Sequence, residues 1–252
     1  MVMKMKSKLF PVGLCFFFLG CSVLKSTQDS LCSEIDENAI SIDLSNKGLE
    51  AIPECIFDTK SARFLNISNN SIERIPEKID QLSLLSFFEC ENNNLSALPE
   101  SFTSLFKMVN LKLQRNRIKT LPKNMSNFKE LNSLNVNHNE LTELPEDIFS
   151  LESLEEILGY HNPIKSLPEC KSKNTKLFWI GLSDGKIKSI PKSFYLLEQL
   201  EYLNLTNNQI TSVPDELGRL KKLKTLDLTG NPISEKEKER IINLLPNTVV
   251  KI

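Results

Sequence analysis

The sequence predicts an α/β solenoid of nine stacked coils, with a concave parallel β-sheet and short helices or helical turns on the convex side. Three observations support this prediction. A 23-residue unit recurs nine times between Ile42 and Asn247 without insertion or deletion. Each unit opens with two apolar residues separated by one residue, the spacing of a strand with one buried face. One coil cannot bury its own core, whereas a stack of coils can.

The apolar pairs fix the register, because each pair begins 23 residues after the one before it. The pairs are Ile42/Leu44, Leu65/Ile67, Phe88/Cys90, Leu111/Leu113, Leu134/Val136, Ile157/Gly159, Ile180/Leu182, Leu203/Leu205 and Leu226/Leu228.

A polar residue follows each pair by three positions, and it is asparagine in seven of the nine units. An asparagine amide both donates and accepts hydrogen bonds, so we expect it to pair with loop backbones of adjacent coils. Lys47 and Gly185 are the two departures. The seven asparagines are Asn70, Asn93, Asn116, Asn139, Asn162, Asn208 and Asn231.

Eight prolines, from Pro53 to Pro214, occupy one further position of the unit, and an acidic residue follows most of them. Proline at the first helical position followed by a carboxylate favours the start of a short convex helix. We therefore interpret the acidic residues as solvated helix starts and not as a binding stripe. They are Glu54, Glu77, Glu100, Glu146, Glu169 and Asp215.

The whole unit has the pattern L-x-L-x-x-N-x-L-x-x-L-P, which resembles the leucine-rich repeat family over about four fifths of the chain. The strict 23-residue period is similar to that of the leucine-rich repeat lipoproteins of spirochaetes. This resemblance implies a surface-exposed binding protein with host contact, and it names no host ligand.

The N-terminus resembles a targeting segment. Residues 1–20 contain three lysines, no acid and an apolar run from Leu9 to Leu19 that is too short for a permanent membrane helix. The stretch Phe18-Leu19-Gly20-Cys21 resembles the bacterial lipobox, which implies acylation of Cys21. We expect a signal peptide over 1–20 and a lipoprotein at the cell surface or outer membrane; an ordinary secretory signal with a periplasmic or secreted protein is the alternative.

The segments that flank the repeats are predicted to cover the ends of the stack. Residues 21–39 would form a lipid-anchored tether and N-terminal cap, where a disulfide between Cys32 and Cys55 would protect the first coil. The repeats span 40–233. Over 234–252, a capping box at Ser234–Glu237 starts a helix that Pro246 stops, and a final extended segment follows.

Strand positions of opposite parity to the core point onto the concave face, where the fold requires no apolar residue. The only tryptophan, two of the three tyrosines and both histidines gather there between the fifth and eighth coils, as expected for a binding hot spot. The alternative is that Trp179 turns inward to fill a gap left by Gly159 in coil six, where Lys171 and Asn174 also depart from the pattern. The candidate partner-binding residues here are Leu158, Tyr160, Trp179, Tyr202, His138 and His161.

A second, charged patch is predicted in coils three and four. Lys112, Arg115 and Arg117 lie beside Glu89 and Glu91. We include Lys112 and Arg115 among the candidate partner-binding residues; the alternative is that these unlike charges simply neutralise one another on a solvated face. Further towards the N-terminus, an apolar pair is predicted at residues 64 and 87.

Catalytic chemistry is the least favoured hypothesis. One equivalent position of three consecutive coils holds His138, His161 and Asp184. The strand spacing separates the outer two residues by nearly 10 Å, which is too far apart to suit a single metal ion. A Cys170–His161 nucleophile pair lacks an orienting third group. Residues 21–252 carry 28 basic and 32 acidic side chains, a net charge of −4 that gives no case for nucleic acid.

The sequence thus predicts a monomeric module that binds a protein partner, with no cofactor, no metal and no enzyme activity. The alternatives are an envelope or periplasmic scaffold and, last, a metal protein or enzyme that uses the His138/His161/Asp184 row.

Overall fold

The computed structural model describes residues 31–252, so the predicted signal peptide and Cys21 lie outside the described residues. The chain divides into two compact units, residues 1–36 and 37–252. In the described part of the first unit, a short helical stretch at 31–34 is followed by a hydrogen bond from the Ile35 N–H to the Cys32 carbonyl.

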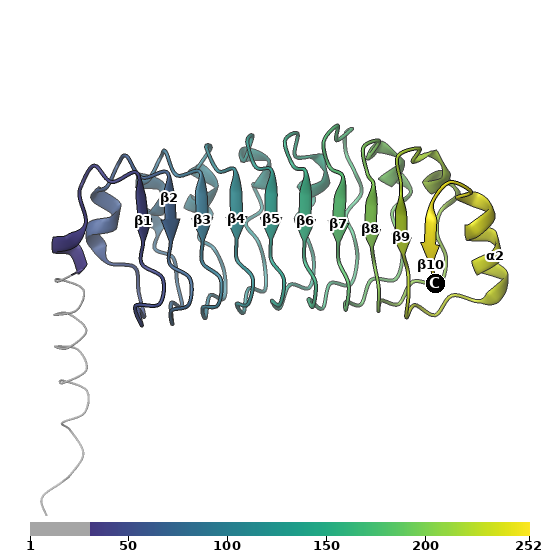
Figure 1. The fold of residues 1–252 in the computed structure, drawn as a ribbon, viewed down its shortest axis with the longest axis horizontal. Coiled ribbons are helices and arrows are strands. Elements are labelled where there is room, and N and C mark those ends of the chain that lie inside the picture. The colour runs from purple at the N-terminus through teal and green to yellow at the C-terminus, as the bar shows by residue number, and fades with distance from the viewer. Residues whose placement is uncertain (1–30) are drawn as a thin grey trace, which may run out of the picture. The chain divides into compact units, whose positions relative to one another are not determined.

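The second unit is a ladder of ten three-residue strands in one parallel sheet, ordered as in the sequence (Figure 1). Each of the nine predicted apolar pairs begins at the central residue of a strand, which confirms the predicted register. The tenth strand comes from the final extended segment. The strands are β1 (Ser41–Asp43), β2 (Phe64–Asn66), β3 (Phe87–Glu89), β4 (Asn110–Lys112), β5 (Ser133–Asn135), β6 (Glu156–Leu158), β7 (Trp179–Gly181), β8 (Tyr202–Asn204), β9 (Thr225–Asp227) and β10 (Val249–Lys251).

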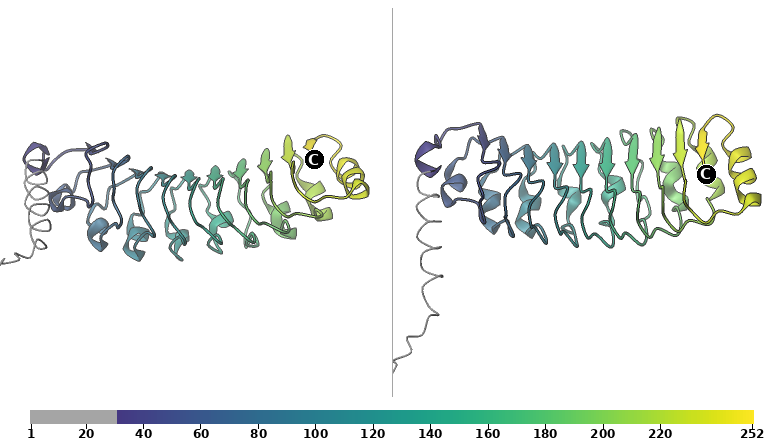
Figure 2. Two further views of the ribbon diagram at one scale, coloured as in Figure 1. Left: turned by 90° about the horizontal axis from the view of Figure 1, so that it is seen from below. Right: turned by 60° about the horizontal axis from the view of Figure 1, so that its bottom comes forward.

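The second unit curves gently, as Figure 2 shows, with the sheet on the concave side and the short helices on the convex side. This is the predicted horseshoe. The convex elements are 3₁₀ helices: η1 (Glu54–Asp58), η2 (Glu77–Gln81), η3 (Glu100–Ser104), η4 (Met125–Asn127), η5 (Ile148–Ser150), η6 (Lys192–Leu196) and η7 (Asp215–Arg219).

The prolines lie one position earlier than the sequence predicted. In five of the helices the proline is the N-cap, with an extended backbone such as ψ 156° at Pro76, and the next residue is the first helical one. The Pro76 carbonyl accepts a hydrogen bond from the Ile79 N–H at 3.1 Å, and this bond closes the tight turn. The proline is therefore useful because its carbonyl is presented to the turn while its fixed φ suits an extended residue.

The recurring asparagine joins each coil to the one before it. In coil four, the Asn116 side chain is nearly buried, and its Nδ2 donates to the Cys90 carbonyl at 2.8 Å and to the Leu113 carbonyl at 3.0 Å. Its Oδ1 accepts from the Leu95 N–H at 2.9 Å. Six more asparagines, from Asn70 to Asn231, repeat this donation to the preceding coil. The predicted structural role of this position is correct.

The two departures from asparagine follow from the neighbouring coil. Lys47 belongs to the first coil, so no earlier coil offers a backbone to bind. At Gly185, the N–H of Ile164 turns to the carbonyl of Asn162 in its own coil at 2.7 Å, and therefore does not need an amide from coil seven.

Coil six has an irregular convex side, because no helix forms between β6 and β7. Lys171 lies exposed where other coils bury an apolar residue. Phe149 and Phe194, from the coils on either side, meet across it edge to face with their ring centroids 5.0 Å apart. Asn174 is fully buried and replaces the missing turn, because it donates to the Leu151 carbonyl and accepts from the Leu177 N–H, both at 2.7 Å.

The C-terminal end is covered by helix α2 (Glu235–Leu244). Half of the predicted capping box forms, since Ser234 Oγ accepts from the Glu237 N–H at 3.3 Å. The Glu237 carboxylate does not return to the cap as predicted; it accepts from the Val213 N–H and from Arg240, which also bonds the Val213 carbonyl. The Glu237 carboxylate can either cap its own helix or bind the last coils, and it binds the last coils.

The described cysteines fall into two groups. Cys90 and Cys170 are free and buried. Cys32 and Cys55 are each disulfide-bonded, and their pairing with each other stays a prediction. Within residues 31–252, no helix is both long enough and apolar enough to cross a membrane.

Asn116→Ala should destabilise the solenoid by about 2–4 kcal/mol, because the Cys90 carbonyl and the Leu95 N–H would lose their buried partner. Urea denaturation followed by circular dichroism measures the loss. Asn94→Ala is the matched control: this neighbouring asparagine is only partly buried, and its replacement should change the free energy of unfolding by less than about 0.5 kcal/mol. Equal losses for the two variants would show that the ladder is not the main tie between coils.

Candidate partner-binding surface on the concave face

The parallel register places the predicted aromatic residues side by side on the concave face. Trp179 on β7 is paired with Glu156 on β6 and with Tyr202 on β8, and Leu158 is paired with Gly181. Tyr160 follows β6 by two residues. The side chains of Leu158, Tyr160, Trp179 and Tyr202 are all partly exposed, so this surface carries apolar area that the core does not need.

Tyr160, Trp179 and Tyr202 form one continuous surface, which we call the aromatic platform. The rings of Trp179 and Tyr202 have centroids 5.0 Å apart with planes inclined by 32°. The Trp179 indole Nε1 donates to the Tyr160 hydroxyl at 3.4 Å. On the far side, the Lys224 ammonium lies 5.8 Å from the Tyr202 ring centroid. The platform therefore crosses coils six to eight without interruption.

Two glycines explain why the platform forms. A Cβ added to Gly181 would lie 2.2 Å from the Tyr160 hydroxyl oxygen, so the tyrosine ring lies over β7 in the space that a side chain would fill. The gap expected at Gly159 is closed by Leu182, whose Cδ2 would be 2.8 Å from an added Cβ. Trp179 is consequently not needed in the core and stays on the concave face. Gly181 was missing from the sequence-based set of site residues, although a glycine at a concave strand position was visible.

The two histidines lie beside the platform, at the position where each strand ends. Residues at this position have left-handed backbone, with φ of 54° at His138 and 55° at His161, and asparagine occupies it in four of the other coils. The imidazole rings stack with centroids 4.3 Å apart. His161 Nδ1 is 3.5 Å from Asp184 Oδ2. The three side chains are aligned because the same left-handed turn recurs in each coil.

The electrostatics of this row favour a neutral His138 and an ionised Asp184. Partial burial lowers the pKa of His138, and the neighbouring His161 and Arg115 lower it further. For Asp184, burial opposes ionisation, but hydrogen bonds from Asn207 and Ser183 outweigh it, so the pKa is lowered.

The residues proposed for metal binding or nucleophilic chemistry are not arranged for either. Within residues 31–252, no group of three or more histidine, cysteine or acidic side chains is placed to hold a metal ion. Burial raises the pKa of the Cys170 thiol to about 12, so little thiolate is present at neutral pH. The Cys170 N–H instead donates to Ser193 Oγ of the convex helix η6.

The second predicted patch is largely self-paired. Lys112 Nζ lies 2.7 Å from Glu89 Oε1, and Gln114 donates to Glu91 on the same neighbouring coil. These pairs favour the interpretation that the charges neutralise one another, whereas Arg115 stays exposed. Phe64 and Phe87 are paired across β2 and β3, and Phe87 is 42% exposed.

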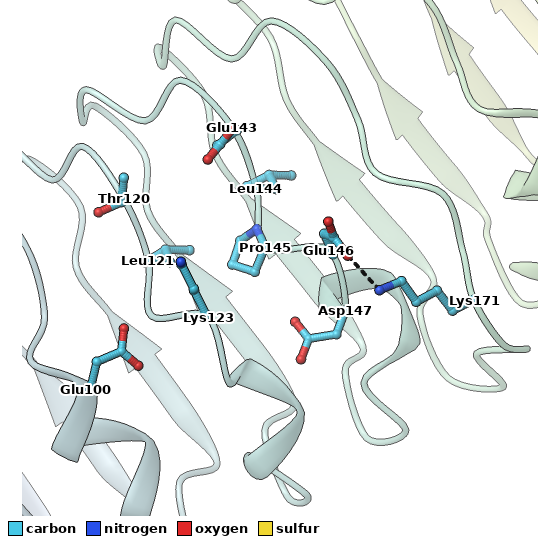
Figure 3. Close-up of a pocket in the computed structure, with 10 residues that line it drawn as sticks. All are labelled: Glu100, Thr120, Leu121, Lys123, Glu143, Leu144, Pro145, Glu146, Asp147 and Lys171. Carbon is cyan, nitrogen blue, oxygen red and sulfur yellow. Dashed lines mark hydrogen bonds and ion pairs between the residues drawn. The ribbon is translucent and has the colours of Figure 1, made fainter.

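A groove of about 570 Å³ lies away from the concave face (Figure 3). It is lined mainly by the segments that lead into the convex turns of coils four and five. Four carboxylates and two lysines surround a small apolar floor, and Lys171 is paired with Glu146 at 2.8 Å. Unlike the platform it has no aromatic residue. Its lining residues are Glu100, Thr120, Leu121, Lys123, Glu143, Leu144, Pro145, Glu146, Asp147 and Lys171.

Comparison with known proteins identifies the repeat. Residues 175–233 match the model of the leucine-rich repeat family. The leucine-rich repeat domain of the type III effector XopL is similar in structure, with a TM-score of 0.78 and 22% identity over 92% of this chain and 82% of that one. No curated protein matches the sequence.

Two further solved structures are similar to parts or most of the chain. The leucine-rich repeat ectodomain of the Arabidopsis thaliana receptor kinase GASSHO1/SCHENGEN3, solved in complex with CASPARIAN STRIP INTEGRITY FACTOR 2, has a TM-score of 0.70 and 26% identity over 85% of this chain and 26% of that chain. A leucine-rich repeat protein of Leptospira interrogans is 21% identical over 92% of this chain and 98% of its own, with a TM-score of 0.36.

The ladder of parallel strands with an open concave face defines a solenoid. Its repeat pattern and its asparagine ladder specify the class further: the chain has the leucine-rich repeat fold, and residues 175–233 match the leucine-rich repeat family.

Gly181→Ala should displace the Tyr160 ring and expose the Trp179 indole to water, because the new Cβ takes the place of the tyrosine hydroxyl. Trp179 is the only tryptophan, so a red shift of the fluorescence emission maximum reports the change directly. Asn66→Ala, at the same strand position on β2, is the control and should leave the emission unchanged because β2 is far from the platform in the sheet order. An unshifted maximum in Gly181→Ala would contradict the packing of Tyr160 over β7.

Proposed function

We propose that this chain is an exported leucine-rich repeat module that binds a protein partner through its concave face, with the aromatic platform as the main contact. The carrying observation is the cluster of partly exposed Tyr160, Trp179 and Tyr202 on a face that needs no apolar side chains. Tyrosine and tryptophan are the residues that most often dominate binding energy at protein interfaces.

Several features support binding over catalysis. The fold commonly serves as a scaffold for protein–protein interaction, and the similar Arabidopsis ectodomain was solved in complex with a partner. The rings support one another through the indole–hydroxyl bond and the Trp179–Tyr202 contact, so little side-chain freedom would be lost on binding. We assign no catalytic residue, no cofactor and no metal.

The localisation is a separate part of the proposal. The targeting sequence at 1–20 and the Phe18–Cys21 stretch support export with a lipid on Cys21, at the cell surface or outer membrane, and contact with a host protein is the role that such a position favours. His138, His161 and Arg115 would lie at the rim of the contact, and Lys112, held by Glu89, would add specificity more than affinity.

The platform is tested by capture of partners with residues 21–252 as bait, followed by the same capture with the Trp179→Ala/Tyr160→Ala double variant. We expect at least a tenfold loss of the captured partner, because two central aromatic residues each contribute on the order of 1–2 kcal/mol or more. Phe106→Ala removes an exposed aromatic residue outside the strands and should bind normally. A partner that binds the double variant as well as the parent overturns the concave assignment.

Cys21→Ala tests the anchor in the full-length chain. Expressed in a bacterium that processes lipoproteins, the parent should enter the membrane fraction and incorporate an alkyne fatty acid, whereas the variant should do neither because the acylated thiol is gone. Protease treatment of intact cells then separates surface from periplasmic display. Labelling that survives in Cys21→Ala would contradict the assignment of the lipid site.

A further inference from the structure

The concave face has an uneven distribution of charge. On β5 to β9, the outward strand positions and the turns that follow them carry three acids, Glu156, Asp184 and Asp227, and neither lysine nor arginine. The only basic-capable side chains at these positions are His138 and His161, and the pKa of His138 is lowered. At these positions, acidic side chains therefore outnumber lysine and arginine, and the nearest lysines, Lys224 and Lys251, are each paired with an acid.

The fold gives Asp227 a positively charged partner and gives Asp184 several hydrogen bonds. Asp227 Oδ2 lies 3.4 Å from the Lys251 ammonium, and its other oxygen accepts from Thr206. Asp184 accepts from Asn207 and Ser183 and faces His161.

Glu156 has fewer partners than either of them. Its carboxylate accepts a hydrogen bond from the Ser133 hydroxyl at 2.5 Å, which is a neutral donor, and it forms no ion pair with any residue of 31–252. It lies directly beside Trp179 in the sheet register and is only partly exposed. A partly desolvated carboxylate attracts a cation more strongly than a fully solvated one, and the indole ring on the neighbouring strand offers a second attraction.

At the other end of the platform, a ring and a carboxylate share a cation. The Lys224 ammonium lies 5.8 Å from the Tyr202 ring centroid and 2.6 Å from Glu201 Oε2, so it is shared between a ring and a carboxylate. Trp179 and Glu156 repeat the ring and the carboxylate, and in the described chain nothing supplies the cation.

We propose that the platform recognises an arginine side chain on the protein partner, with the guanidinium stacked on Trp179 and paired with Glu156. Arginine fits better than lysine because its planar fork stacks on an aromatic face and still pairs with a carboxylate. Leu158 and Tyr160 then contact apolar residues beside the arginine. This inference rests on the proposed function and specifies the chemistry of its partner.

The test uses two short peptides and one methyl glycoside as probes and residues 21–252 as the protein. Ac-Leu-Arg-Leu-amide carries the guanidinium, Ac-Leu-citrulline-Leu-amide has nearly the same shape without the charge, and methyl glucoside represents a neutral ring that could also stack on the platform. Binding is followed by the emission of the single tryptophan and by its indole N–H resonance in ¹H–¹⁵N spectra.

We expect the arginine peptide to shift the Trp179 indole resonance and to bind at least tenfold more tightly than the citrulline peptide. Raising the salt concentration should weaken the arginine peptide alone. Glu156→Gln should reduce the preference for arginine to less than threefold, since the ring remains and the carboxylate does not. Glu152→Gln, the same change at an exposed position of the same coil outside the sheet, should keep the full preference.

Three results would overturn the inference. The first is equal binding of the arginine and citrulline peptides, and the second is a shift of the Trp179 indole resonance caused by methyl glucoside and not by the arginine peptide. The third is an unshifted resonance with millimolar arginine peptide in the parent protein, when its thermal melting shows that it is folded. A captured partner whose binding needs Trp179 and Tyr160 but is unchanged in Glu156→Gln would refute arginine recognition and leave the proposed function standing. A captured partner that binds both the Trp179→Ala/Tyr160→Ala variant and the Glu156→Gln variant as well as the parent would refute arginine recognition and the proposed function together.

Discussion

The stacking of coils through a repeated asparagine is the constraint on which the rest of the structure depends. Each strand has only three residues, so the ladder bonds alone leave most of each loop backbone unpaired. An amide such as that of Asn116 pairs with two carbonyls and one N–H from two coils, which satisfies buried groups that water cannot reach. Because seven of the nine coils use asparagine at the same place, the spacing is constant and the side chains of the concave face form regular rows.

Coil six shows how such a lattice accommodates irregular sequence. Its convex side has no helix, and the missing apolar volume is supplied by Phe149 and Phe194 from the flanking coils. The buried Asn174 pairs the backbone that a helical turn would have paired. The strand side is undisturbed, because β6 and β7 keep the common register. The deviations on the convex side therefore do not move the concave residues.

The platform joins two kinds of attraction within one surface. The rings offer apolar area that stays ordered without a partner, because Tyr160 and Trp179 hold each other. Glu156 adds a charge that the fold leaves without a counter-ion in its described part. Aromatic area gives binding energy, and a single unpaired carboxylate gives discrimination between partners, since a neutral or acidic group would leave it desolvated and unmatched. Lys112 and Glu89 lack this property, because each already neutralises the other.

The sequence by itself determined the number of coils, the strand register and the role of the asparagines, because a strict 23-residue period fixes which positions face the core and which face the solvent. It left open whether Trp179 lies on the concave face or fills the gap at Gly159. Only the tertiary structure decided how side chains from different coils meet. The Tyr160 ring lies on Gly181, Leu182 fills the space at Gly159, and Glu237 binds the last coils and not its own helix cap. These outcomes depend on the direction of long side chains across 4.8 Å rungs, where residues far apart in sequence compete for one volume or one donor, and a periodic pattern carries no information about that competition.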